Sequence, residues 1–81
     1  RIDAFLQLLL RGDRRRVMEA VDTALASGLA IEEVQEDLIG EAQRRIGTLW
    51  ERNQIGVADE HMATAISRQA LAHLHEAGFP A

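Results

Sequence analysis

Residues 46–65 read IGTLWERNQIGVADEHMATA, and no other stretch of the chain says as much about its fold. It predicts the end of one amphipathic helix, a short polar break and the start of a second helix. Trp50 then lies on the last turn of the first helix, and Glu60 and His61 lie on the first turn of the second. Groups at two adjacent helix ends can converge on one face of a bundle, where a ligand can lie against them.

The rest of the chain repeats the three- and four-residue spacing of apolar residues that is typical of amphipathic helices. We expect helices at about residues 2–10, 14–27, 31–52 and 57–77. Gly12 and Gly28 end the first two helices, and Asp13 is a good N-cap for the second. No segment alternates as a strand does, and short connections favour antiparallel neighbours. The sequence therefore predicts an all-α, antiparallel four-helix bundle that forms one domain over residues 1–81.

The same spacing predicts which side chains form the core. We expect the following residues to be mostly buried: Leu6, Leu9, Val21, Leu25, Leu38, Ile46 and Ile66. On the last helix, the residues expected to face inward are Val57, His61 and Ala65, followed by Leu71 or Ala72. The core is thin, because a chain of this length buries only about 60 to 65 % of its unfolded surface.

Two glycines lie inside the expected third helix, at Gly40 and Gly47. Each costs about 1 kcal/mol relative to alanine in a helix interior. Close packing between helices is one explanation for both. The other is that Gly47, one turn before Trp50, leaves room for a flat ligand or for an adjoining domain.

Composition limits the class of protein. Hydrophobic residues make up 47 % of the chain, but no tract is long enough to span a membrane, and there is no secretory signal pattern. The absence of cysteine fits a cytoplasmic protein, and the net charge of −4 argues against direct contact with nucleic acid. The chain begins inside an expected helix without Met, so we expect it to be a fragment of a longer protein.

The sequence offers little support for catalysis or metal binding. It has no cysteine, few Ser or Thr residues near a histidine, and no glycine-rich phosphate loop. It also lacks HExxH and the Glu-x-x-His repeat of di-iron bundles, while His73 and His75 point in different directions on a helix. We therefore expect neither an enzyme nor a metal site.

The residues around the polar break each have a structural and a functional interpretation. A lone Trp usually belongs to a core, but Trp50 lies at a helix end, where its indole can stack against a bulky organic group. Glu60 either suits the positive end of the helix dipole or accepts hydrogen bonds from ligand hydroxyls such as those of a ribose, while Asp59 fits the electrostatic role better. His61 is either a core histidine or a ligand contact that supplies a donor and an acceptor.

The segment from Trp50 to His61 resembles the helical cap of cobalamin-binding photoreceptor regulators. In that family a Trp, nine further residues and a Glu-His pair lie over the upper face of adenosylcobalamin. The resemblance covers essentially the whole chain, from LLLRGDRRRV at residues 8–17 through ASGL at residues 26–29 to the last helix. It implies that Trp50 lies beside the upper axial adenosyl group, that Val57 packs against the same group, that Glu60 holds the ribose and that His61 completes the pocket.

The resemblance also implies the wider organisation of the protein. Adenosylcobalamin is shared with a Rossmann-like cobalamin-binding domain that follows the cap, and residues 77–81 resemble the start of that connection. The full protein is then a light-sensing or cobalamin-sensing regulator of transcription, a homo-oligomer in which a separate domain binds DNA. One position departs from the family: some members carry a cobalt-ligating His directly after the Trp, where this chain has Glu51.

Two alternatives remain open. Corrinoid methyltransferase proteins carry a similar helical cap, with a Gly and then an aromatic residue at the end of the third helix. Their last helix typically begins with a Phe-Leu-Pro-like segment, where this chain has GVADEH at residues 56–61, and this difference favours the adenosylcobalamin sensor. The second alternative is a cofactor-free bundle that dimerises or docks a partner, and its signature would be an exposed apolar patch.

Overall fold

The computed structural model describes residues 1–78, and every regular element in this range is helical. The elements are α1 (Ile2–Arg11), α2 (Arg14–Ala26), α3 (Ile31–Glu33), η1 (Val34–Gly40), α4 (Glu41–Glu51) and α5 (Val57–Gly78). Because α3, η1 and α4 continue one another without a break, the described chain forms four helical rods. The predicted all-α, four-helix fold is confirmed. Pro80 and most of the expected connection to a further domain lie outside the described residues.

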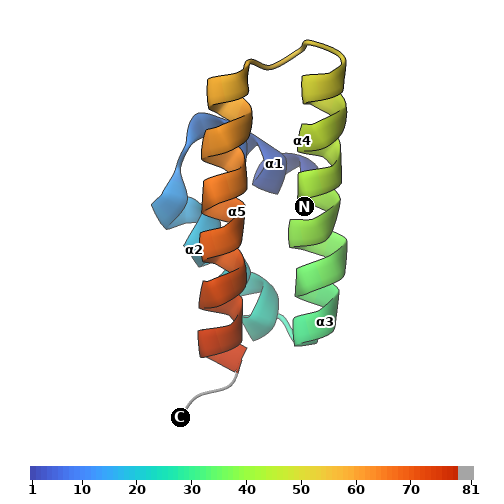
Figure 1. The fold of residues 1–81 in the computed structure, drawn as a ribbon. Helices are drawn as coiled ribbons and strands as arrows, with labels where there is room; N and C mark the ends of the chain where they lie inside the picture. The colour runs from blue at the N-terminus through green and yellow to red at the C-terminus, as the bar shows by residue number, and fades with distance from the viewer. Residues whose placement is uncertain (79–81) are drawn as a thin grey trace.

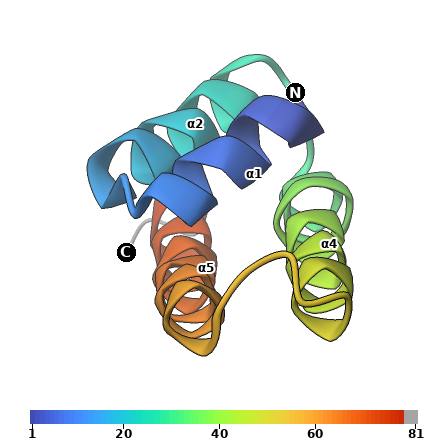
Figure 2. The ribbon, with the colours of Figure 1, turned by 90° about the horizontal axis from the view of Figure 1, so that it is seen from above.

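The four rods are arranged as two pairs (Figure 1). Helices α4 and α5 run antiparallel, side by side, and are joined by a short turn at one end of the molecule. Helices α1 and α2 form a second antiparallel pair that lies obliquely across one side of the α4–α5 pair, as Figure 2 shows. The α1–α2 pair therefore covers one side of α4 and α5.

The predicted helix ends of the α1–α2 pair are confirmed. Gly12 adopts a left-handed conformation with φ of 71°, and its backbone N–H reaches the carbonyl oxygens of Leu8 and Leu9. The side chain of Asp13 accepts a hydrogen bond of 3.2 Å from the backbone N–H of Arg16, as an N-cap residue should. These bonds satisfy backbone groups that the helix ends would otherwise leave without partners.

The long third rod differs from a plain α-helix in one respect, because residues Val34–Gly40 form a π-helical segment. A Cβ atom added at Gly40 would lie 3.1 Å from the carbonyl oxygen of Gln35, five residues earlier in the same rod. The crowding at Gly40 therefore comes from its own rod. Close packing against a neighbouring helix, one of the two explanations expected from the sequence, does not account for this glycine.

The core is built from all four rods. Five of the residues predicted to be buried are buried, namely Leu9, Val21, Leu38, Ile46 and Ile66. Leu6 and Leu25 are only partly buried, and pack against the core from its edge. Burial in the core is the main stabilising term, at about 25 cal/mol per Å² of apolar surface.

The predicted inward face of the last helix is wrong. Val57, His61 and Ala65 are exposed, and so is Ala72, whereas Leu71 is partly buried. The residues of α5 that are buried are Ala63, Ile66, Ser67, Ala70 and Leu74. The helix buries Ile66 and Leu74, and the alanines of the same face allow the neighbouring helices to approach closely. The face that begins at Val57 is therefore directed outward.

No helix within residues 1–78 is both long enough and apolar enough to cross a membrane.

Gly47 and Gly12 predict opposite responses to substitution by alanine. A Cβ at Gly47 would meet no heavy atom within 4 Å, so Gly47→Ala should stabilise the fold by about 0.5–1 kcal/mol through helix propensity. A Cβ at Gly12 would lie 2.6 Å from Sδ of Met62 on a left-handed backbone, so Gly12→Ala should destabilise it. Urea unfolding followed by circular dichroism measures both, and a destabilised Gly47→Ala variant would show that this position is packed.

Candidate functional site

The turn between α4 and α5 is held at both ends by local hydrogen bonds. Asn53 has a positive φ of 57°, its N–H bonds to the carbonyl oxygen of Trp50 at 3.0 Å, and Gln54 N–H bonds to that of Leu49 at 2.8 Å. These are the bonds of a Schellman motif, which ends a helix sharply. The turn therefore brings the first residues of α5 back beside the last turn of α4, where Trp50 lies (Figure 1).

Asp59 closes the other end of this turn. Its Oδ2 atom accepts a hydrogen bond of 3.1 Å from the backbone N–H of Gly56, just before α5. From the sequence, Asp59 is expected to act only electrostatically at the helix start. The structure adds a hydrogen bond that satisfies a backbone donor there. The carboxylate of Glu60 is thus not needed for this cap.

Trp50 and Val57 are the large hydrophobic side chains that residues 1–78 leave exposed, at 48 % and 56 % of their full accessible surface. Trp50 is therefore not a core residue, which removes the usual explanation for a single Trp on an apolar helix face. Both residues lie on helix ends that the turn joins, so their apolar surface is accessible to another molecule.

The Glu60 carboxylate has a defined orientation. Its Oε2 atom accepts a hydrogen bond of 2.9 Å from the hydroxyl of Thr64, one turn further along α5. Its Oε1 atom lies 3.0 Å from Nδ1 of His61. The Glu60 side chain is 21 % exposed and that of His61 is 76 % exposed, so the interpretation of His61 as a core histidine is wrong.

The helical period places Trp50 and Glu60 on the same side of the α4–α5 pair. Gln43 and Trp50 are two turns apart on the third rod, and Glu60 and Ser67 are two turns apart on α5. The Ser67 hydroxyl lies 2.9 Å from Oε1 of Gln43, so these two rows face each other along one seam. Trp50 and Glu60 lie at the end of that seam next to the turn.

Three residues at this seam were not identified from the sequence, namely Gln43, Thr64 and Ser67. Thr64 stands four residues after Glu60, and the i, i+4 rule for helices is a signal that could have found it. The Gln43–Ser67 contact joins residues 24 positions apart, and Ser67 is 1 % exposed. No local pattern predicts such a contact, because it depends on how the two helices are rotated.

The opposite flank of the third rod carries an ion-pair network. Glu41 accepts hydrogen bonds from Arg44 at 3.1 Å and from Arg45 at 3.2 Å, and Arg45 also reaches Asp3 of α1 at 2.8 Å. Both hydrogen bonds lower the pKa of the Glu41 carboxyl below its usual range, and the bond from Arg44 has the larger effect. The network joins α4 to α1 on the flank away from α5.

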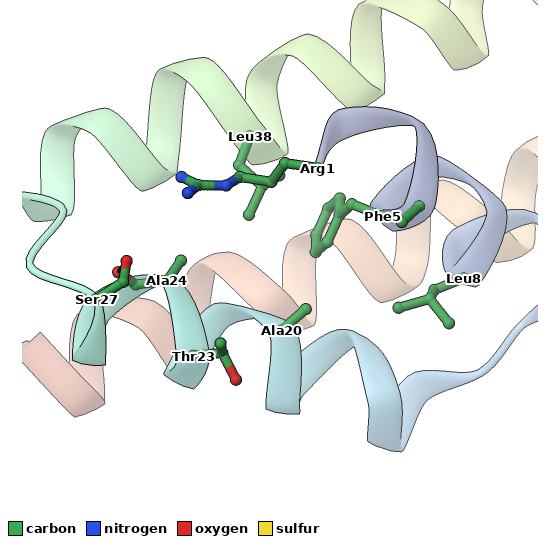
Figure 3. A pocket seen from close by; sticks show the side chains of 9 residues that line it. Arg1, Phe5, Leu8, Ala20, Thr23, Ala24, Ser27 and Leu38 are labelled. Carbon is green, nitrogen blue, oxygen red and sulfur yellow. Dashed lines mark hydrogen bonds between the residues drawn. The ribbon is translucent and has the colours of Figure 1, made fainter.

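An apolar hollow of about 280 Å³ lies elsewhere, between α1, α2 and Leu38 of η1 (Figure 3). Phe5 and Leu8 of α1 and the short side chains of Ala20 and Ala24 on α2 line it. The polar groups that line it are few, and none of Trp50, Val57, Glu60 and His61 takes part. Within residues 1–78 no three His, Asp or Glu side chains gather as metal ligands would.

The geometry defines a small helical module. At the turn of its α4–α5 pair, the surface carries both apolar and polar side chains. Residues 1–75 match the family model described as B12 binding domain, so the chain belongs to that family, the helical cap of cobalamin-binding proteins. No curated protein sequence matches the chain closely enough to serve as a relative. Membership confirms the expected class of cofactor and implies a companion cobalamin-binding domain.

The Glu41 network predicts a specific pH response. Because the folded state lowers the pKa of Glu41, the stability linked to this carboxyl is present above its unfolded pKa and is lost as pH falls through the folded pKa. An NMR titration should show the lowered pKa, and replacing both Arg44 and Arg45 by Gln should raise it. An unchanged titration in the double variant would contradict the assigned cause.

Proposed function

We propose that this chain caps the upper axial face of adenosylcobalamin in a light-sensing or cobalamin-sensing regulator. The observation that supports this most is the exposure of Trp50 and Val57 beside an oriented Glu60 carboxylate at the α4–α5 turn. Family membership supplies cobalamin as the cofactor class, and the match of Trp50, Val57, Glu60 and His61 to the photoreceptor caps supports the adenosyl form.

The residues fit such a group in shape and in chemistry. The half-exposed indole of Trp50 offers a flat apolar surface, and Gly47, one turn earlier, leaves open space on the same rod. Each oxygen of the Glu60 carboxylate has one partner in this chain, so acceptor capacity remains for ligand hydroxyls. Apolar and hydroxyl-bearing parts of one ligand can therefore both be held here.

The mechanism follows from what these side chains do. Trp50 and Val57 lie against the adenosyl group and exclude water, while Glu60 accepts hydrogen bonds from its ribose. When bound, the cofactor supplies a cobalt–carbon bond that light can cleave. Once Trp50 and Glu60 lose their contacts, their preference for the closed arrangement is lost, and the bundle shifts relative to its companion domain.

The proposal also covers the setting of the module. It is a cytoplasmic, non-enzymatic sensor unit, and a Rossmann-like companion domain holds the lower face of the corrin ring. The full protein forms a homo-oligomer, and a separate domain contacts DNA. A corrinoid methyl carrier would have no adenosyl ribose for Glu60 to bind. A cofactor-free interaction module would use Trp50 and Val57 as its docking surface.

Substitutions at the turn separate these functions. In a protein that contains the companion domain, Trp50→Ala should weaken adenosylcobalamin binding by about 1–3 kcal/mol, the scale of a lost aromatic contact. Glu60→Gln should weaken it less, because a neutral hydrogen bond replaces a charge-assisted one. Methylcobalamin, which lacks the ribose of the adenosyl group, should respond little to Glu60→Gln. Spectroscopic titration in the dark gives the dissociation constants.

The 81-residue chain alone is the control and should bind neither cobalamin tightly, because nothing then holds the lower face of the corrin ring. Equal loss of both cobalamins on Glu60→Gln would show that Glu60 maintains the fold rather than the adenosyl group. That result would favour the cofactor-free interaction module.

A further inference from the structure

We propose that Thr64 is a positioning residue that holds the Glu60 carboxylate so that both of its oxygens present an acceptor to two neighbouring ligand hydroxyls. This inference rests on the proposed function, in which Glu60 faces the ribose of the cofactor. It adds a residue that acts on the ligand only through Glu60.

The hydrogen bond of Thr64 is the first observation. A helical Thr commonly bonds to the backbone carbonyl four residues earlier, and Thr48 does so with the carbonyl oxygen of Arg44 at 3.2 Å. The residue four positions before Thr64 is Glu60, yet the Thr64 hydroxyl bonds to the Glu60 side chain at 2.9 Å. Thr64 therefore orients a carboxylate.

The second observation is that the two Glu60 oxygens have different partners. Thr64 occupies one acceptor position of Oε2, and Nδ1 of His61 lies 3.0 Å from Oε1. A carboxylate offers about four acceptor positions, so one remains on each oxygen. Two acceptors fixed side by side match the two adjacent hydroxyls of a ribose.

Fixing Glu60 in advance should improve binding of the hydroxyl-bearing ligand. A free Glu side chain loses rotamer freedom when it binds, and this loss opposes association. With Thr64 and His61 on its two oxygens, Glu60 has already lost part of that freedom. The benefit is limited to ligands that use Glu60, which separates positioning from a general effect on the fold.

The test uses Thr64→Val in a protein that contains the companion domain, with adenosylcobalamin and methylcobalamin as probes in the dark. We expect the dissociation constant of adenosylcobalamin to rise about three- to tenfold, the scale of one lost hydrogen bond, and that of methylcobalamin to change less than about twofold. Thr64→Ser should restore binding, because it restores the hydroxyl. Thr48→Val, the matched control on α4, should change neither constant.

A double variant tests whether Thr64 acts through Glu60. If it does, Thr64→Val should have little further effect in a Glu60→Ala background, which has no side-chain acceptor left for Thr64 to orient. If circular dichroism shows that Thr64→Val lowers the melting temperature, Thr64→Ala is used in its place, because alanine has a higher helix propensity.

Two outcomes overturn the inference. Equal weakening of both cobalamins by Thr64→Val and Thr64→Ala would show a structural role for Thr64. Unchanged adenosylcobalamin binding in these variants, with Glu60→Gln still selective, would refute positioning and leave the proposed function standing. A non-selective Glu60→Gln would instead refute the proposed role of Glu60, and the inference with it.

Discussion

The packing of α5 against every other helical element is the constraint on which the rest of the structure depends. This helix contacts α1, α2, α3, η1 and α4, and its buried stripe is made of Ala63, Ile66, Ala70 and Leu74, with Ser67 beside them. Ala63 and Ala70 are fully buried, and their small side chains let the neighbouring helices approach closely. Once this stripe is buried, the rotation of α5 is settled, and so is the direction of each of its other side chains.

The site is a consequence of that rotation. Glu60 is partly buried and lies two turns before Ser67, on the row of α5 that meets Gln43, whereas Val57 and His61 are exposed. The Gln43–Ser67 contact joins the two helices along the same seam, and the Schellman motif after Trp50 ends α4 at the right place. The locally bonded turn thus joins the helix end that carries Trp50 to the helix start that carries Glu60.

The two sides of the third rod have separate tasks. One side carries the Arg44–Glu41–Arg45 network and the Arg45–Asp3 ion pair, which join it to α1. These groups are largely solvated, so such pairs add little to stability, and their role is to complete a polar surface. The other side carries Gln43, Gly47 and Trp50, which face α5 or open space. A companion domain can cover that side without disturbing the network.

The sequence by itself determined the helical elements and the position of the turn between α4 and α5. Gly12 and Asp13 act through bonds to residues within five positions, and the Trp50 to His61 spacing lies within one turn and its flanking helices, so local physics decides both. Only the tertiary structure decided which face of α5 is buried, that Leu6 and Leu25 lie at the core edge, and that His61 is exposed. Those outcomes depend on competition among apolar stripes for contact with other helices. The Gln43–Ser67 contact belongs to the same group, because no short-range pattern in the sequence encodes how two helices are rotated against each other. The π-helical segment at Val34–Gly40 was likewise not expected from the sequence.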